Sequence, residues 1–371
     1  MQKWTYLVCG LILGLGACRT IQPAGKAILP AARLQPMGRA LLTDQGHLEL
    51  ISSGAQVGFS FTGTSCTLYT HLPRAEDHNF LQYTLDGVYQ RRLRLDGRTP
   101  EPLVISAPGS GRHTVWLIKA SEAHSGPIFI EKISGSGLRV LPVPARPWIE
   151  FIGNSITCGA AADTSLVPCG QGAYHDQHDA YHAYGARLAR ALNMNYLLSS
   201  VSGIGIYRTW NRDGPAMPEV YERADFQLNN GLPWDFTRFT PAVVVISLGT
   251  NDLSAGDGVF PRPPFAPEVF IEAYVSFVRR IKSHHPRAQI VLLNSPLVGT
   301  PQARVLEEAL DQVKQQLDRA YPQTEPVQLL RFQPLRATGC TGHPNVQEHG
   351  LLAEQLLPQF NVLLQKLEMR N

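Results

Sequence analysis

Four short segments in the second half of the chain carry residues that could perform acyl transfer. They read GNSIT at 153–157, SGIG at 202–205, GTND at 249–252 and HPN at 343–345. A serine hydroxyl is a weak nucleophile near neutral pH, so it needs a base that takes its proton as it attacks. Ser155 is the candidate nucleophile and His343 is the candidate base.

Hydrogen-bond donors are expected beside this pair, because a tetrahedral intermediate carries a negative oxygen that must be stabilised. The candidate donors are the backbone N–H groups of Ser155 and Gly203 and the side-chain amide of Asn251. Losing one such donor typically costs about 10²-fold or more in turnover. The sequence therefore predicts an oxyanion hole made by three separate segments.

Each of these residues also has a structural interpretation. Ser155 could cap a helix N-terminus, and Gly203 and Asn251 could simply form turns. His349 is an alternative base, but it falls where the last helix begins and suits a structural cap. The order of the four segments favours the catalytic interpretation, since a motif gains weight from its structural context.

Strand-like and helical segments alternate after Pro147. Continuous apolar runs such as AVVVIS at 242–247 are typical of strands covered on both faces, so we expect a parallel sheet between layers of helices. In such sheets ligands bind beyond the carboxyl ends of the strands, which is where the first three catalytic segments fall. Helices are predicted near 179–192, 267–284, 301–320 and 347–368.

A different pattern precedes this region. Short strand-like runs between turn residues fill the chain from about Met37 to Leu141, which predicts a β-sandwich or jelly roll. The proline-rich segment LPVPARPW at 141–148 marks the boundary. We therefore expect a β-sandwich domain over 37–143 and an α/β domain over 147–371.

The N-terminus has the features of an export signal. Lys3 precedes an apolar run at 4–17 that is too short to span a bilayer stably. The run ends LGAC, which resembles a bacterial lipobox and makes Cys18 the predicted lipidated residue; a simple secretory signal is the alternative. Residues 1–18 are thus a predicted signal peptide and 19–36 a predicted linker of an exported, membrane-anchored protein.

The four segments resemble those of the SGNH (GDSL-like) hydrolases. The details GNSITCG, AYGARLARAL and SGIGIYR, preceded by a β-sandwich, are more similar to carbohydrate esterase family 2. The resemblance implies a three-layer, flavodoxin-like α/β domain and removal of acetyl groups from plant polysaccharides such as xylan or glucomannan, often at the sugar 6-hydroxyl. It carries the nucleophile onto Ser155, the base onto His343 and the oxyanion donors onto Ser155, Gly203 and Asn251, without a cofactor.

Two positions near His343 depart from the pattern of these hydrolases. Thr341 stands where an aspartate usually precedes the histidine by two residues, so the resemblance implies a Ser-His dyad with an imidazole oriented by a backbone carbonyl. Gly342 stands where relatives often carry an aromatic residue. A third departure, Asn154 in place of aspartate, should leave the nucleophile turn intact.

Substrate contacts are expected from aromatic residues close to the crevice, because aromatic faces suit sugar rings. The candidates are Tyr207, Trp210 and Trp234, although each could instead pack a loop on the sheet. The polar loop at 71–80 is the part of the sandwich expected to reach the crevice. Two alternative functions remain. The chain could be a carbohydrate-binding protein with a weak or inactive hydrolase domain, or a lipase or thioesterase with a broad apolar pocket.

Composition excludes some functions. A formal net charge of +3 over 371 residues, without a basic run, argues against nucleic acid as a partner. His175, His178 and His182 have helix-compatible spacings but lack the glutamate of a zincin motif, so no metal is predicted. Among the cysteines, Cys158 and Cys169 could pair across a short loop, with Cys340 as a competing partner for Cys158.

Overall fold

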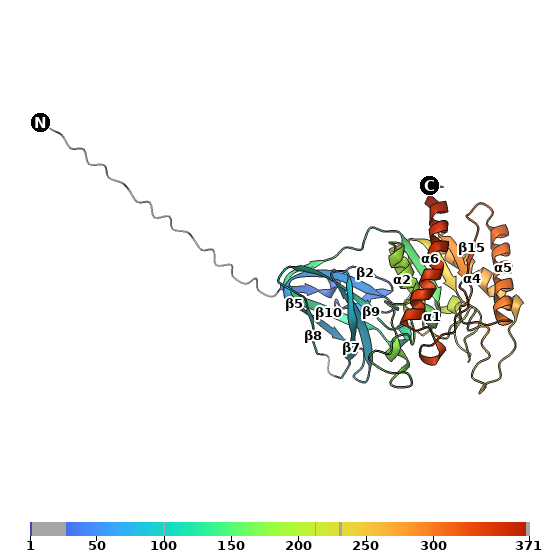
Figure 1. Cartoon of the computed structure of the whole chain (residues 1–371), viewed down its shortest axis with the longest axis horizontal. Helices are drawn as coiled ribbons and strands as arrows, with labels where there is room; N and C mark the ends of the chain where they lie inside the picture. Colours follow the sequence, from blue (N-terminus) through green and yellow to red (C-terminus); the bar gives the residue numbers. More distant parts are fainter. Residues whose placement is uncertain (2–26, 99–100, 212, 230–231, 369–371) are drawn as a thin grey trace.

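The chain folds into two domains that lie against each other (Figure 1). The computed structural model describes the chain except residues 2–26, 99–100, 212, 230–231 and 369–371. The predicted lipidation site Cys18 therefore lies outside the described residues. No helix in the described part combines the length and the hydropathy that a membrane span requires.

The N-terminal domain is an antiparallel jelly-roll sandwich, as predicted. Its longest strand, β5, pairs with β10 on one side and β9 on the other. Phe59, Phe61, Val115 and Ile130 are fully buried between its layers. Its strands are β1 (Ala27–Pro30), β2 (Pro36–Met37), β3 (Ala40–Leu42), β4 (Leu48–Leu50), β5 (Gln56–His71), β6 (His78–Leu85), β7 (Val88–Asp96), β8 (Leu103–Ser106), β9 (Arg112–Lys119) and β10 (Ile128–Val140).

Residues 27–36 correct the predicted linker. β1 pairs with β10 in the register Ala27↔Gly135, so the described sandwich begins at Ala27 rather than at Met37. The segment has no apolar alternation and contains two prolines, which is why it suggested a tether. Its strand conformation comes from the partner strand rather than from local propensity.

The C-terminal domain is built on a five-stranded parallel sheet with the order β12-β11-β13-β14-β15, which is the flavodoxin-like order. β11 pairs in parallel with β12 on one side and β13 on the other. The strands are β11 (Trp148–Gly153), β12 (Asn195–Ser200), β13 (Pro241–Ser247), β14 (Gln289–Leu293) and β15 (Gln328–Leu330). The α-helices are α1 (Ser155–Cys158), α2 (Tyr184–Ala191), α3 (Met217–Val220), α4 (Pro267–His284), α5 (Gln302–Ala320) and α6 (Val346–Glu368).

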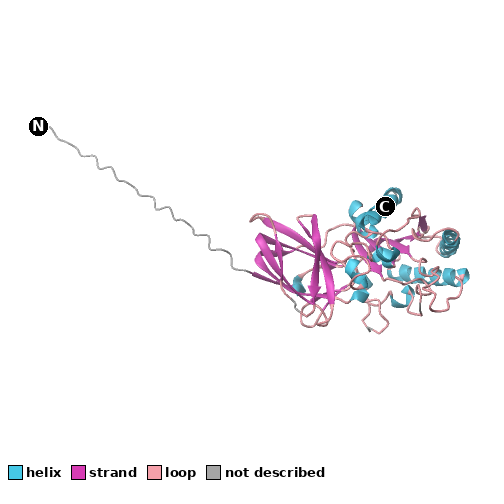
Figure 2. Cartoon of the chain, turned by 60° about the horizontal axis from the view of Figure 1, so that its bottom comes forward, coloured by secondary structure: helices cyan, strands magenta, loops and turns pink. Residues whose placement is uncertain are grey.

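Helices cover both faces of this sheet, which confirms the predicted three layers (Figure 2). Phe151 and Val245 pack with α2 and α6 on one face. Their neighbours Ile152 and Ile246 pack with α4 and α5 on the other face. Successive side chains of a strand point to opposite faces, so strands buried on both sides need the continuous apolar runs seen in the sequence.

The two domains meet through buried polar contacts. Arg92 of β7 donates from Nη1 to the carbonyls of Asp176 and His178, at 2.7 and 2.9 Å, and forms an ion pair with Asp163. The side-chain carbonyl of Gln82 on β6 accepts the Tyr181 N–H at 3.0 Å. Buried polar groups need fixed partners, so these contacts set one orientation of the sandwich against the α/β domain.

Candidate active site

The nucleophile candidate lies on a tight turn after β11. The side chain of Asn154 accepts the Ile156 N–H at 3.0 Å and caps α1. Asn154, and not Ser155, is therefore the N-cap, which removes the purely structural interpretation of Ser155. A Cβ at Gly153 would lie 2.1 Å from the Thr157 hydroxyl, so the close approach of strand and helix requires glycine there.

The hydroxyl of Ser155 faces the imidazole of His343. Ser155 Oγ and His343 Nε2 lie 2.8 Å apart although 188 residues separate them in sequence. This is the distance expected between a nucleophile and its general base. The structure thus brings together the two residues that the sequence predicts to be catalytic.

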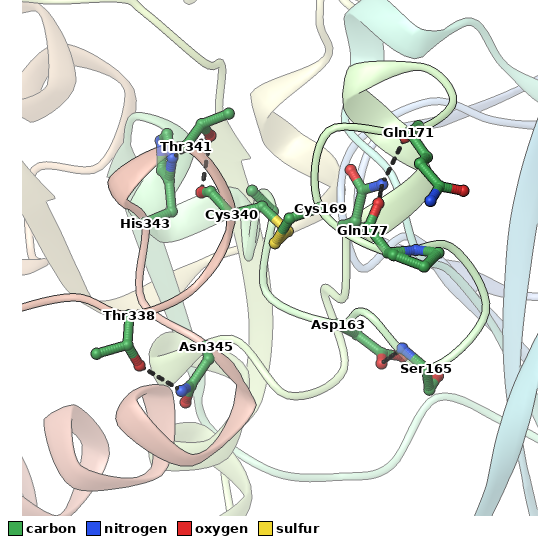
Figure 3. Close-up of a disulfide and its surroundings, with 12 residues drawn as sticks. Asp163, Ser165, Cys169, Gln171, Gln177, Thr338, Cys340, Thr341, His343 and Asn345 are labelled. Atoms are coloured by element: carbon green, nitrogen blue, oxygen red, sulfur yellow. Dashed lines mark hydrogen bonds between the residues drawn. A yellow bond between two sulfur atoms is a disulfide. The ribbon is translucent and has the colours of Figure 1, made fainter.

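The loop that carries His343 is anchored on both sides (Figure 3). A disulfide joins Cys340 to Cys169 across 171 residues. On the other side, Asn345 and Glu348 form a reciprocal capping box at the start of α6, with N–H to side-chain distances of 2.9 and 2.8 Å. These contacts fix the base immediately before the last helix.

The other ring nitrogen of His343 contacts a hydroxyl. Thr341 Oγ1 lies 3.0 Å from Nδ1 and donates its own hydrogen to the Cys340 carbonyl at 2.7 Å. The hydroxyl is therefore free to accept Nδ1–H, the tautomer in which Nε2 can accept the Ser155 proton. The hydrogen bonds of the described residues give Nδ1 no carboxylate partner.

Burial sets the protonation state of the base. Desolvation lowers the pKa of His343 below its ordinary value, and the carbonyls of Cys340 and Thr341 offset this only in part. A neutral imidazole near neutral pH is the form that can accept a proton. The alternative base His349 is fully buried, accepts the Tyr184 N–H at 3.2 Å and has a pKa lowered to about 3 by burial, so it is part of the packing behind the site.

The predicted oxyanion donors lie beside Ser155. Gly203 lines the same cleft with φ +76°, and a Cβ there would lie 2.7 Å from Trp210 Cδ1. Asn251 donates one amide hydrogen to the Ile204 carbonyl at 2.7 Å, which leaves the second hydrogen for the cleft. As the first residue of α1, Ser155 has an N–H without an intrahelical acceptor.

Asp252 joins the two loops that carry these donors. Its buried carboxylate accepts the backbone N–H groups of Ile206 and Tyr207 at 2.9 and 3.0 Å. Burial raises its pKa to about 6, with the N–H donors opposing the rise. In the sequence this residue is part of the GTND segment, without an assigned role. In the structure it holds the SGIG loop against the loop that carries Asn251.

A cleft of about 820 Å³ opens above Ser155 and His343. Trp210 and Tyr174 are its exposed aromatic residues, with 43% and 42% of their surfaces accessible. Tyr174 was missed from the sequence; its hydroxyl donates to the Ser202 hydroxyl at 3.3 Å, and its ring lies edge-on to His343. Leu253, Ala255, Leu297 and Val298 add an apolar part to its lining.

Two predicted substrate-binding residues lie elsewhere. Trp234 is 6% exposed and packs in the core against Phe239, so we withdraw it from the cleft. Tyr207 packs against Phe265, accepts the Ala266 N–H at 3.2 Å and lines a separate hollow. Both residues therefore have a packing role, which was the alternative to substrate binding in the sequence analysis. Trp210 alone of the three reaches the cleft.

The three histidines that were considered as metal ligands each contact a different residue. His175 donates to the His78 carbonyl at 3.0 Å, His178 contacts Glu122, and His182 contacts Asp179. Among the described residues, ligand atoms of His78, His175 and Asp176 come within 4.8 Å of one another. Hydrogen bonds account for this group, because Asp176 contacts His78 and also accepts the Ala173 N–H at 3.0 Å.

The cysteine pairing differs from the short-loop hypothesis. Cys169 pairs with Cys340, whereas Cys158 is a buried free thiol at the end of α1. Sequence proximity suggested Cys158 as the partner, but α1 directs that side chain toward Ser200, 3.2 Å away. Cross-links depend on the distance between Cβ atoms in the fold and not on separation along the chain.

Fold and site together define a serine-containing ester hydrolase of the three-layer α/β type. Residues 151–351 match the GDSL-like Lipase/Acylhydrolase family, and the chain belongs to this family. Residues 36–144 match the carbohydrate esterase 2 N-terminal domain. The combination makes the chain an enzyme of the carbohydrate esterase class, which confirms the resemblance seen in the sequence.

Relatives share both domains. An acetylxylan esterase / glucomannan deacetylase from Cellvibrio japonicus is 25% identical over 335 residues, which cover 89% of each chain. A family two carbohydrate esterase structure from the same organism superposes with a TM-score of 0.79 at 23% identity and covers 93% of this chain and 100% of that one. A family two esterase from Clostridium thermocellum in complex with cellohexaose has a TM-score of 0.78 at 25% identity, covering 91% and 99%.

Proposed function

We propose that this chain removes O-acetyl groups from a carbohydrate through a covalent acetyl-Ser155 intermediate. The observation that carries the proposal is the 2.8 Å contact between Ser155 Oγ and His343 Nε2 in a cleft that Gly203 and Asn251 also line. Plant polysaccharides such as acetylated xylan or glucomannan are the proposed substrates, since a relative of similar length carries both activities in its name. The sugar 6-hydroxyl is one candidate position.

The reaction begins when His343 Nε2 takes the Ser155 hydroxyl proton as Oγ attacks the acetyl carbonyl. The carbonyl oxygen becomes an oxyanion and accepts hydrogen bonds from the N–H groups of Ser155 and Gly203 and from the Asn251 amide. The imidazolium then donates its proton to the departing sugar oxygen. In the second half of the reaction His343 takes a proton from a water that attacks the acetyl carbonyl, and the imidazolium then protonates Ser155 Oγ as the bond between Oγ and the acetyl carbon breaks and acetate leaves.

Ser155 and His343 act in this proposal as a dyad without an acid. The Thr341 hydroxyl, 3.0 Å from Nδ1, orients the imidazole in place of a carboxylate. A neutral acceptor stabilises the imidazolium less than a carboxylate would. The carbonyls of Cys340 and Thr341, which raise the pKa of His343, add to this neutral support.

Trp210 is the proposed sugar platform. Its exposed ring stands beside Gly203, where an acetylated sugar must enter to reach Ser155. Gly342, which precedes His343 in the chain, adds no aromatic ring to the cleft. This arrangement suits a polysaccharide chain that lies across the cleft rather than a sugar enclosed on all sides.

The apolar wall of Leu253, Leu297 and Val298 supports a second candidate function, in which the acyl group is longer than acetyl. Initial rates on p-nitrophenyl acetate, butyrate and octanoate separate the two, together with acetate release from acetylated xylan and acetylated glucomannan. We expect acetate to be the preferred acyl group and one glycan to be preferred. A preference for octanoate would favour a lipase or thioesterase.

The same assays on Ser155→Ala and the exposed control Ser283→Ala test the nucleophile. Hydrolysis should disappear only in Ser155→Ala. Glycan binding without serine-dependent hydrolysis would instead favour a carbohydrate-binding protein with an inactive hydrolase domain.

We also propose that the protein is exported and lipid-anchored at Cys18. This rests on the apolar run and the LGAC sequence at 15–18. Metabolic labelling with a fatty acid should mark the wild-type protein and not Cys18→Ser. Unlabelled wild-type protein in the soluble periplasmic or extracellular fraction would favour the simple secretory signal.

A further inference from the structure

A carboxylate of the sandwich domain lies directly behind the active site. Glu122 stands between β9 and the 3-10 turn Ala123–Ser125, and it is 4% exposed. It belongs to no catalytic segment of the sequence. The neighbouring residue Ala123 packs in the core of the α/β domain, so this segment inserts into the other domain rather than resting on its surface.

The carboxylate contacts three segments that build the site. Oε2 accepts the backbone N–H of Ser202 at 2.6 Å and lies 3.5 Å from the thiol of Cys158. Oε1 lies 3.3 Å from His178 Nε2. His178 Nδ1 accepts the Ala161 N–H at 3.4 Å, so Nε2 is the nitrogen that carries a proton toward Glu122.

Two of these partners stand next to a group of the proposed reaction, and the third stands next to an aromatic residue that lines the cleft. Ser202 precedes the oxyanion glycine, Cys158 ends the helix that begins with Ser155, and His178 lies edge-on to the Tyr174 ring. We propose that Glu122 is a positioning residue, supplied by the sandwich, that holds the Ser202–Gly203 peptide and the nucleophile helix in the geometry of the oxyanion hole. This inference rests on the proposed function of Ser155 and Gly203.

The segment that carries Glu122 is fixed by a buried lysine. Lys119 Nζ donates to the Ser121 carbonyl at 3.1 Å, the Ser121 hydroxyl at 2.9 Å and the Glu122 carbonyl at 2.7 Å. The Ala180 N–H of the α/β domain donates to the Ala120 carbonyl at 3.1 Å. A side chain held by such a shell can place a catalytic group accurately, which a mobile surface glutamate could not.

The position requires a carboxylate rather than an amide. Three donors converge on Glu122, and only an ionised carboxylate offers acceptors alone. Burial opposes the charge, but the interactions with His178 and the Ser202 N–H outweigh it and lower the pKa of Glu122 to about 2. The ionisable groups that interact with the charge of Glu122 are His178, His124, Cys158, Lys119, Tyr174 and His343.

The negative charge also acts on the base. It raises the pKa of His343, in opposition to desolvation and to His178. Removing the charge should therefore lower the pKa of His343 and move the acid limb of kcat/KM to lower pH. A residue with only a packing role would not produce this shift.

Glu122→Gln and Glu122→Asp test the proposal in the full-length protein with p-nitrophenyl acetate. In Glu122→Gln the side-chain NH₂ group faces one of the hydrogen-bond donors that contact Glu122. In Glu122→Asp the carboxylate is kept, but it lies one methylene farther from these donors. We expect kcat to fall about 10-fold or more in both variants with KM within about twofold, because displaced oxyanion donors cost transition-state stabilisation. Only Glu122→Gln should shift the acid limb to lower pH.

Glu131→Gln is the matched control, since it removes a partly exposed sandwich carboxylate that pairs with His71. Circular dichroism and thermal unfolding report how much of each variant is folded. A kcat within twofold of wild type in folded Glu122→Gln would overturn the proposal. The proposal would also be overturned if kcat of both variants fell only in proportion to the fraction of folded protein.

A second readout separates this inference from the proposed function. A fluorophosphonate forms a tetrahedral adduct with an activated serine, whatever the natural substrate is. We expect Ser155 to be labelled more slowly in Glu122→Gln than in wild type and Glu131→Gln. Labelling without acetate release from any glycan would contradict the proposed substrate only, whereas equal labelling rates would contradict the role of Glu122.

Discussion

The hydroxyl of Thr341 lies 3.0 Å from Nδ1 of His343, in the place where related hydrolases usually have an aspartate. Thr341 adopts φ +51° and ψ +30°, a left-handed conformation that β-branched residues rarely adopt. Such backbone strain typically costs about 1–3 kcal/mol and often marks a functional site. A glycine would relieve the strain at Thr341 but would remove the hydroxyl that contacts the base.

Replacing Thr341 by valine should lower kcat about fivefold, because a hydrogen bond of this kind is worth about 1 kcal/mol. Valine keeps the shape and the backbone strain of threonine and removes only the hydroxyl. Thr341→Ser keeps the hydroxyl and should stay within twofold of wild type. Steady-state kinetics on p-nitrophenyl acetate checks both, and equal rates for the valine and serine variants would show that backbone carbonyls alone orient His343.

An aspartate at the same position tests whether the neutral arrangement is sufficient. In a protease that depends on its acid, loss of that acid costs about 10⁴-fold. We expect Thr341→Asp to change kcat less than tenfold, since the Thr341 hydroxyl already contacts Nδ1 and the Cys340 and Thr341 carbonyls also raise the pKa of His343. A gain of tenfold or more would show that the dyad is a defective triad.

The pH dependence follows from the buried base. Burial lowers the pKa of His343 below its ordinary value of 6.5. Only the neutral imidazole accepts the Ser155 proton, so kcat/KM should rise with pH as the imidazolium loses its proton. The midpoint of this acid limb should lie below pH 6.5 in a pH series at constant ionic strength; a midpoint above that value would contradict a desolvated base.

The disulfide between Cys169 and Cys340 should matter for both stability and rate. It closes a loop of 171 residues and ends three residues before His343. Replacing both cysteines by serine should lower the free energy of unfolding by about 2–5 kcal/mol in urea denaturation, and should lower kcat because the base loop loses an anchor. A reductant should lower the free energy of unfolding and the kcat of the wild type to those of the double variant, and should leave the double variant unchanged.

Trp210→Ala should weaken glycan binding more than it affects a small ester. Loss of aromatic packing on a sugar ring corresponds to about a 3- to 10-fold rise in KM for the acetylated polysaccharide. Trp210→Phe should recover part of this. Tyr207→Phe, which lies outside the cleft, is the control. An equal effect of Trp210→Ala on p-nitrophenyl acetate would indicate that Trp210 acts by supporting Gly203 instead.

Periodicity was sufficient to predict both domains. Continuous apolar runs such as 242–247 predicted the parallel sheet, and the helix predicted near 267–284 matches α4. The local sequence pattern did not predict the structure of segments whose conformation depends on a partner distant in the sequence. β1 becomes a strand because β10 lies beside it, and Cys340 pairs with Cys169 because the fold brings together residues 171 positions apart.

The site was predictable where motifs carry the chemistry. The segments around Ser155, Gly203, Asn251 and His343 do converge on one cleft. Glu122 left no comparable signal, because it stands in another domain and its partners become neighbours only after the domains dock. The hydroxyl of Thr341 was visible in the sequence, but its contact with Nδ1 depends on a left-handed turn that threonine rarely adopts.

The most direct test of the account is to trap the covalent intermediate. Enzyme mixed with an acetylated oligosaccharide is quenched in acid within one turnover, and intact mass spectrometry with peptide mapping then locates any adduct. We predict one acetyl group on Ser155 in the wild type and none in Ser155→Ala, with release of acetate only by the former. Acetate release without an adduct, or by Ser155→Ala at the wild-type rate, would contradict a mechanism through acetyl-Ser155.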